Sequence, residues 1–185
     1  MVPLDRAHVD TDQIMPKQHL KRIERTGFGD LVFSDWRADE DFVLNRDQHA
    51  GATILVTGPN FGSGSSREHA AWGLQQYGFD AIIAPSFADI FRSNCAKIGL
   101  LTVALTVERC NDLIALATEQ PQVEIDIDVR GQTVRTPAWT EHFEIDAHTK
   151  RVLIEGLDAI DLTLARERRI AAFERTRPAF MPATR

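Results

Sequence analysis

The stretch Ala52-Thr53-Ile54-Leu55-Val56-Thr57 leads into Gly58-Pro59-Asn60-Phe61-Gly62-Ser63-Gly64-Ser65 and then into Ser66-Arg67-Glu68-His69. The first six residues are apolar and β-rich, which predicts a short buried strand. Over residues 67–77 the apolar side chains recur at helical spacing, and Gly78 stands where a helix C-cap belongs. The stretch therefore predicts a strand, a glycine-rich loop and a helix in direct succession.

The alternation of strands and helices continues toward the C-terminus. Residues 81–84, closed by Pro85, predict a second strand, which lies parallel to the first if the helix between them is a right-handed crossover. A loop and helix follow over residues 86–97, a third strand over 100–105 and a helix over 106–119. This pattern predicts the α/β class.

The remaining segments are shorter and less regular. Strict alternation over residues 123–129 predicts a half-exposed strand, and a turn at Gly131-Gln132 leads into a strand over 133–135. We expect a further strand over 143–145, a brief helix over 150–156 and a charged terminal helix over 162–175. The N-terminal third has no sustained period, so we expect loops with strand fragments packed on the core.

Size and charge limit the class of protein. With 185 residues and 43% hydrophobic content, the chain is long enough for one well-cored domain over residues 1–185, with a C-terminal helical extension. Its 27 acidic and 21 basic side chains give a net charge of −6, without a basic run that could follow a phosphate backbone. No apolar stretch is long enough to cross a bilayer, and the N-terminus has no signal pattern. We expect a soluble cytoplasmic protein that binds neither nucleic acid nor membrane.

Cysteine usage argues against a metal or redox centre in this chain. The two cysteines, Cys95 and Cys110, are too far apart for a CxxC motif. A cubane iron–sulfur cluster usually takes three or four cysteine ligands, which this chain cannot supply. We therefore expect no metal ligands here and read both cysteines as reduced, partly buried thiols.

The loop before the predicted helix has the chemistry of an anion site. Its glycines allow close backbone approach, and the helix start offers unpaired N–H groups carrying about half a positive charge. Ser66 and the fork of Arg67 could add donors to a carboxylate or phosphate. The loop does not match the sequence motif of a P-loop, of a dinucleotide-binding fingerprint or of a nucleophile elbow. A plain helix start with Ser65 or Ser66 as N-cap is the alternative.

Three motifs in order carry a resemblance to a known superfamily. Residues 62–70, Gly-Ser-Gly-Ser-Ser-Arg-Glu-His-Ala, resemble the signature of the swivelling domain of aconitases and isopropylmalate isomerases. Val9-Asp10-Thr11-Asp12-Gln13-Ile14 resembles its Asp-Thr-Asp motif, and residues 86–91 resemble its next block. Length and the segments 25–29, 35–37 and 155–158 are similar to bacterial small subunits of 3-isopropylmalate dehydratase, which usually carry a further segment before the equivalent of Val2. The implied fold is the swivelling β/β/α domain of the aconitase C-terminus, a mixed sheet core flanked by helices.

The resemblance also implies roles for individual residues. Ser65 would be the catalytic base, with Arg67 and Asp12 as further catalytic residues. For Asp12, an Asx turn or a helix cap is the alternative. The substrate carboxylate would be held by Gly64, Ser66 and Arg67. A second carboxylate clamp is expected after Asp12, where we favour Arg25 among the candidates Lys17, Lys21, Arg22 and Arg25. Glu68 and His69 are assigned supporting roles.

The implied reaction is the interconversion of 2-isopropylmalate and 3-isopropylmalate by dehydration and rehydration, a step of leucine biosynthesis. The implied partner is a large subunit that carries a [4Fe-4S] cluster as Lewis acid. Rival hypotheses are a related small subunit of the homoaconitase or methylmalate dehydratase type, a non-catalytic dicarboxylate-binding module, and a free-standing hydrolase with Ser65 as nucleophile. The hydrolase lacks a second motif that would supply its histidine and carboxylate.

Overall fold

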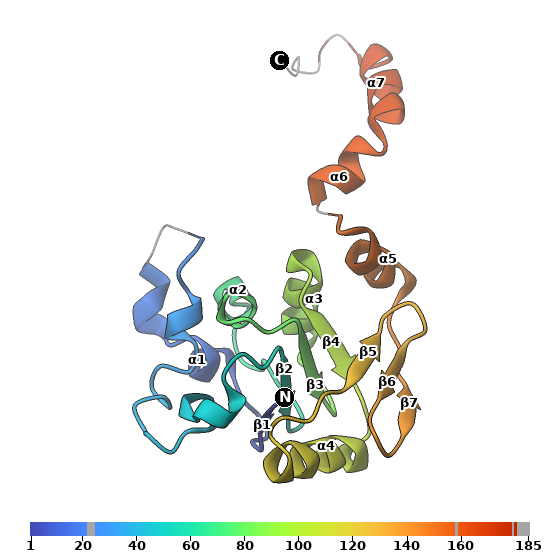
Figure 1. Cartoon of the computed structure of the whole chain (residues 1–185). Helices are drawn as coiled ribbons and strands as arrows, with labels where there is room; N and C mark the ends of the chain where they lie inside the picture. The colour runs from blue at the N-terminus through green and yellow to red at the C-terminus, as the bar shows by residue number, and fades with distance from the viewer. Residues whose placement is uncertain (22–24, 158, 179, 181–185) are drawn as a thin grey trace.

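A four-stranded parallel sheet forms the centre of the molecule in a computed structural model (Figure 1). The structure describes residues 1–21, 25–157, 159–178 and 180, so Arg22 and Asp158 lie outside it. Neighbouring strands are hydrogen-bonded in the order β1-β2-β3-β4. Their bounds are Val2–Leu4, Ile54–Thr57, Ala81–Ala84 and Leu101–Ala104.

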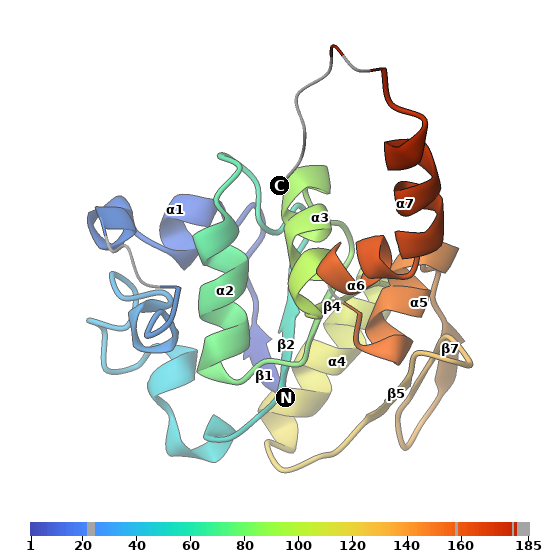
Figure 2. The same ribbon diagram turned by 90° about the horizontal axis from the view of Figure 1, so that it is seen from above.

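Both faces of this sheet are covered, which explains its continuous apolar strands. Successive side chains of a strand point to opposite faces, so Leu55 and Val56 enter different cores. Two helices, α2 (Glu68–Tyr77) and α3 (Asp89–Ile98), cover the face of Leu55, and α4 (Val107–Glu119) covers the other face (Figure 2). The three strand and helix pairs predicted from the sequence are confirmed. The predicted C-cap is also confirmed, since Gly78 ends α2 in the left-handed conformation with φ 118°.

A separate antiparallel sheet follows α4. Its strands are β5 (Asp126–Asp128), β6 (Thr133–Arg135) and β7 (Thr140–His142), in that order. Val134 of β6 is fully buried in the core beneath α4. The α/β class is confirmed, with parallel and antiparallel strands divided between two sheets.

The predicted strand over residues 143–145 is wrong. The strand ends one residue earlier, and Phe143 buries its ring in the core beneath α4. Its backbone N–H and carbonyl are both satisfied by Gln132, through the carbonyl and the side-chain amide of that residue, each at 3.0 Å. Because one residue satisfies both groups, an apolar segment here needs no strand partner.

The N-terminal third is loop-rich, as predicted, and it packs against α2. Apart from β1, it contains the one-turn helix α1 (Thr11–Ile14) and several short 3₁₀ helices. Buried aromatic rings, among them Phe28, Phe33 and Phe42, fix it to the core that α2 and α3 also share. The 3₁₀ helices are Lys17–Lys21, Gly29–Leu31, Val43–Asn45 and Asp47–His49.

Three helices close the chain: α5 (Ala147–Glu155), α6 (Ala159–Leu164) and α7 (Glu167–Arg175). The predicted single helix over residues 162–175 is wrong, because the Arg166 N–H bonds to the carbonyl of Thr163 at 2.9 Å and closes the first segment. Helices α6 and α7 project away from the sheets (Figure 1). Within the described ranges, no helix combines the length and the apolar character that crossing a membrane requires.

Candidate active site

Two loops leave neighbouring parallel strands and run side by side at the same edge of the sheet. The loop after β1 and the loop after β2 are joined by backbone hydrogen bonds, including Gly62 N–H to Val9 O at 2.8 Å and Thr11 N–H to Ser63 O at 2.9 Å. Asp10 and Ser63 form a parallel bridge. Crevices beyond the carboxyl ends of parallel strands are common ligand sites in α/β proteins. The pairing of β1 with β2 thus brings the Asp-Thr-Asp and Ser-Ser-Arg segments together.

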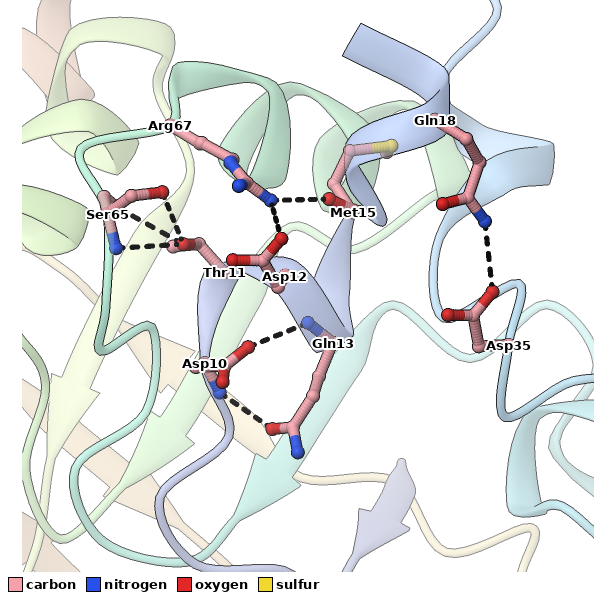
Figure 3. Close-up of polar contacts among 9 residues, drawn as sticks. All are labelled: Asp10, Thr11, Asp12, Gln13, Met15, Gln18, Asp35, Ser65 and Arg67. Atoms are coloured by element: carbon pink, nitrogen blue, oxygen red, sulfur yellow. Dashed lines mark hydrogen bonds and ion pairs between the residues drawn. The ribbon is translucent and has the colours of Figure 1, made fainter.

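Asp10 starts the helix that carries the first segment. Its carboxylate accepts the Gln13 N–H at 2.8 Å, and the Gln13 side chain accepts the Asp10 N–H at 2.9 Å, which is a complete capping box. Figure 3 shows this pair below the site. Because Asp10 caps the helix, the capping role considered for Asp12 is not needed.

Ser65 lies against Thr11, the first residue of α1 (Figure 3). The two hydroxyl oxygens are 3.1 Å apart. The Thr11 hydroxyl also lies 3.2 Å from the Ser65 carbonyl oxygen and accepts the Ser65 N–H at 3.2 Å. Ser65 is exposed, whereas Thr11 is only 1% exposed. A buried residue therefore fixes the position of an accessible hydroxyl.

The Arg67 side chain also reaches α1, where it contacts Asp12, the residue after Thr11. Its Nη1 donates to Asp12 Oδ1 at 2.5 Å and to the Met15 carbonyl at 3.3 Å. The Arg67 side chain is 18% exposed and that of Asp12 is 53% exposed. Both contacts use Nη1 alone, and no described residue accepts from the other guanidinium nitrogens. Ser65, Arg67 and Asp12 are thus brought together, with N–H groups left for a ligand.

The start of α2 differs from the simple capped helix. Arg67 is the N-cap residue, and among the described residues no side chain accepts a hydrogen bond from the first turn of α2, so the hypothesis of Ser65 or Ser66 as N-cap is wrong. The Ser65 hydroxyl is drawn to Thr11 instead. Gly64 and Ser66 are exposed beside it. First-turn N–H groups without a side-chain acceptor favour an anion at this position.

The other candidate cations do not join this group in the described structure. Arg25 is exposed along the side of α2, where its guanidinium lies 5.6 Å from the Trp72 ring centre and its carbonyl accepts from Gln76 at 2.8 Å. Lys17 and Lys21 are exposed on a 3₁₀ helix.

The two residues assigned supporting roles make other contacts. His69 packs its ring against Phe28 and Trp72. Glu68 pairs with Lys97 of α3 at 3.5 Å.

The described residues do not form a site for a metal cluster. Among described residues, no group of three or more histidine, cysteine or acidic side chains is placed to hold a metal ion. Cys95 and Cys110 are buried in different cores. Burial raises the pKa of both thiols, that of Cys110 to about 12, which opposes the thiolate form that metals bind.

A large groove of the described structure lies away from the residues of this site. About 780 Å³ in volume, it runs between α3 and α5, with Ala96, Ile145 and Val152 among its apolar lining residues. None of the Ser65, Arg67 or Asp12 side chains lines it. Cavity size therefore does not locate the chemistry, and we base the site on convergent polar groups.

Two contributors were missed from the sequence. Thr11 stands inside the Asp-Thr-Asp motif, but a buried threonine gives no chemical signal of its own. The Met15 carbonyl accepts a hydrogen bond from Arg67, and because it is a backbone group, the residue type does not reveal it. The position of Thr11 directly after the capping residue Asp10 was the one usable clue.

Chemically, the site can hold an anion against a hydroxyl. Arg67 supplies a fixed positive charge, α2 supplies first-turn N–H groups, and Ser65 and Ser66 supply exposed hydroxyls. A carboxylate at this point would place the rest of its molecule near Ser65 Oγ. Because Gly64, Ser65 and Ser66 are exposed, this loop would contact such a ligand from one side and leave its other side open.

Family models match both parts of the chain. The model described as aconitase C-terminal domain matches residues 1–108, which include the site and the whole parallel sheet. The model of the C-terminal domain of the 3-isopropylmalate dehydratase small subunit matches residues 160–184, the region of α6 and α7.

Similar proteins extend the match over nearly the full length. The 3-isopropylmalate dehydratase small subunit of Rubrobacter xylanophilus is 52% identical over 98% of this chain and 93% of its own. The protein of the same name from Frankia alni is 54% identical with the same coverage. The crystal structure of a 3-isopropylmalate dehydratase from Methanocaldococcus jannaschii superposes with a TM-score of 0.62 at 25% identity, covering 93% of this chain and 99% of that one.

Proposed function

Since the chain belongs to the family of 3-isopropylmalate dehydratase small subunits, we propose that it is the small subunit of a two-chain hydro-lyase that interconverts 2-isopropylmalate and 3-isopropylmalate in leucine biosynthesis. The observation that carries this proposal is the convergence of Ser65, Arg67 and Asp12 at the start of α2. Aconitase-type dehydration needs a base beside a bound carboxylate, and the Ser65 hydroxyl and the Arg67 guanidinium are suited to these two roles.

Ser65 acts as the base in its alkoxide form. In the dehydration direction, the substrate C–H bond breaks and its proton passes to Ser65 Oγ. The electron pair of that bond forms the C=C bond, and the C–O bond to the neighbouring hydroxyl breaks, so that this hydroxyl leaves as hydroxide with the electron pair of the C–O bond. In rehydration, hydroxide adds to one carbon of the C=C bond and Ser65 returns the proton to the other. A serine hydroxyl is a very weak acid, so its alkoxide depends on nearby donors and positive charge.

Arg67 and the helix start provide this field and also bind substrate. The remaining N–H groups of the guanidinium, the Ser66 hydroxyl and the backbone at Gly64 receive one carboxylate. Asp12 orients Arg67 through their ion pair. Because Asp12 is half-exposed, this pair contributes little to stability, at most about 1 kcal/mol. Its value lies in fixing the direction of the guanidinium.

The second carboxylate requires another cation, for which we propose Arg25. The Arg25 guanidinium lies over the ring of Trp72 in α2. Trp72 in turn contacts His69, which lies in the first turn of the same helix. Arg25→Ala should raise the KM for isopropylmalate more than it lowers kcat. Lys17→Ala serves as the comparison, because Lys17 is exposed on a different turn of the N-terminal segment.

We assign the iron–sulfur cluster of the reaction, a Lewis acid, to the large subunit, because the residues described here offer no site for it. The open side of the Ser65 loop would face that subunit. The two free buried cysteines agree with a reducing compartment, and we place the complex in the cytoplasm. The alternative homoaconitase and methylmalate dehydratase reactions differ from this one in the side group of the substrate. The names of the relatives favour isopropylmalate.

The decisive test is the Ser65→Ala chain, copurified with the large subunit of the same organism. Turnover of 3-isopropylmalate, followed by ultraviolet absorbance of the unsaturated intermediate, should fall to background. Ser93→Ala, an exposed serine of α3, is the matched control and should retain full activity. Full turnover by the Ser65→Ala complex would refute the role of base and favour a non-catalytic dicarboxylate-binding module.

A second test concerns the partner. The purified chain alone should be inactive toward isopropylmalate, and activity should appear on addition of the cluster-bearing large subunit. Turnover by the single chain, without the large subunit, would contradict the proposal.

A further inference from the structure

Thr11 makes more contacts with Ser65 than a packing residue requires. Its hydroxyl oxygen lies 3.1 Å from Ser65 Oγ, lies 3.2 Å from Ser65 O and accepts the Ser65 N–H at 3.2 Å. Its own N–H is held by the Ser63 carbonyl at 2.9 Å, so the backbone on both sides is fixed. A single buried side chain thus touches every polar atom of Ser65 (Figure 3).

The hydroxyl of threonine has one hydrogen and two acceptor positions. One acceptor position is taken by the Ser65 N–H. While Ser65 is neutral, its own hydroxyl hydrogen can occupy the second, and the Thr11 hydrogen then points to the Ser65 carbonyl. When Ser65 loses its proton, the Thr11 hydrogen can turn to Ser65 Oγ. The second arrangement is a charge-assisted hydrogen bond, roughly twice as strong as a neutral one.

We propose that Thr11 is a positioning residue for the reaction: it holds Ser65 Oγ toward the substrate and donates a hydrogen bond to it only when it is an alkoxide. This inference rests on the proposed role of Ser65 as the base. Thr11 does not touch substrate and transfers no proton. The stiffness of a β-branched side chain at χ1 and its burial keep the donor in place without competing water.

Several charged groups surround this pair, and all of them must stay unchanged in the test. Asp10 and Asp12 lie on either side of Thr11, Arg67 faces it from the start of α2, and Glu68 pairs with Lys97 of α3. The substitution Thr11→Val removes the hydroxyl and keeps the shape and every charge. A change in pH dependence in that variant therefore reports on the hydroxyl itself.

The experiment uses the complex with the large subunit. For Thr11→Val we expect kcat to fall about 10- to 100-fold, the range for losing a hydrogen bond to a charged group, with KM for isopropylmalate unchanged. The limb on which kcat rises with pH should move to higher pH, because an unsupported alkoxide forms less readily. Thr11→Ser should restore most of kcat and the original profile.

Thr57→Val is the matched control. Thr57 is also fully buried, at the end of β2, and its hydroxyl donates to the Arg6 carbonyl at 3.2 Å rather than to the site. It should leave kcat and the pH profile unchanged. If Thr11→Val does not fold, Thr11→Ala replaces it, with the same expected loss of kcat and shift in profile.

The outcomes separate this inference from the proposed function. If Ser65→Ala is inactive while Thr11→Val keeps the wild-type kcat and profile, the role of Thr11 is refuted and that of Ser65 stands. Equal losses in Thr11→Val and Thr11→Ser would also refute it, because a hydroxyl at position 11 would then not restore activity. If Ser65→Ala is active, the proposed function itself fails.

Discussion

Gly62 and Gly64 both adopt positive φ, at 76° and 90°, but their surroundings differ. A Cβ on Gly62 would overlap the base of the buried Phe91 ring, whereas a Cβ on Gly64 would meet Asp10 and Thr11 at 3.5 Å, an ordinary contact. We expect Gly62→Ala to lower the free energy of unfolding by about 2–5 kcal/mol, from backbone strain plus overpacking, and Gly64→Ala by only about 1–2 kcal/mol. Urea denaturation of both variants measures the difference, and equal losses would contradict it.

The two cysteines give a prediction on pH. Burial raises the pKa of both thiols, so they stay protonated in the folded chain at a pH where unfolded thiols ionise. Iodoacetamide should therefore label neither thiol at pH 8 until denaturant is added. Because the pKa of Cys110 is raised in the folded chain, its contribution to the free energy of unfolding is complete below the ordinary thiol pKa of 9.0. This contribution is lost as the pH rises toward about 12, because the unfolded thiol ionises first. Rapid labelling of the native chain would show that a core opens.

At the residue scale, the sequence predicted the polar members of the site but not what holds them. Ser65 and Arg67 stand in a long motif, from which we proposed their roles. Asp10 took the capping role considered for Asp12, because its backbone is extended and its carboxylate faces Gln13. Which of two aspartates caps a helix depends on backbone angles that residue types do not reveal.

At the scale of elements, α2 is held very close to the N-terminal segment by two glycines. A Cβ on Gly29 would lie 2.6 Å from the Gln76 carbonyl oxygen, a backbone atom of α2. A Cβ on Gly73 would instead meet the tips of Met15 and Val32 at 2.6 and 2.8 Å. Side-chain tips can move and helix backbone cannot, so the two positions should respond differently to alanine.

We therefore expect Gly29→Ala to be the more damaging substitution. Overpacking against backbone should cost about 1–3 kcal/mol, whereas at Gly73 the gain in helix propensity, about 1 kcal/mol, offsets much of the strain. Thermal unfolding of the two variants tests this order. A larger loss for Gly73→Ala would mean that Met15 cannot adjust.

Helices and strands were predicted correctly where the spacing of apolar residues stayed regular. The prediction failed where local hydrogen bonds of the backbone decided the structure. The strands and helices from β2 to α4 followed their patterns because both faces of the sheet are buried. The apolar Phe143 was placed in a strand, but Gln132 satisfies both of its backbone groups. The break near Arg166 depends on one local hydrogen bond, which periodicity cannot reveal.

On the scale of the whole molecule, the last helices contribute little to the folded body. Large apolar side chains of α6 and α7 are exposed, with Leu164 at 58% and Phe173 at 63%. A chain ending at Leu157 should keep its melting temperature within about 2 °C, because little apolar surface is exposed by the deletion. Differential scanning calorimetry measures this. A drop of more than about 5 °C would show that the extension packs on the body in solution.

The pairing of β1 with β2 also governs when the site can form. Thr11 and Ser65 are 54 positions apart, and they meet only after the loops beyond these two strands have been joined. Contacts between distant segments form late in folding because a long loop must close first. On dilution from denaturant in the presence of the large subunit, the helical circular dichroism signal should therefore return before the ability to support catalysis, because the helices form from local contacts and the site does not.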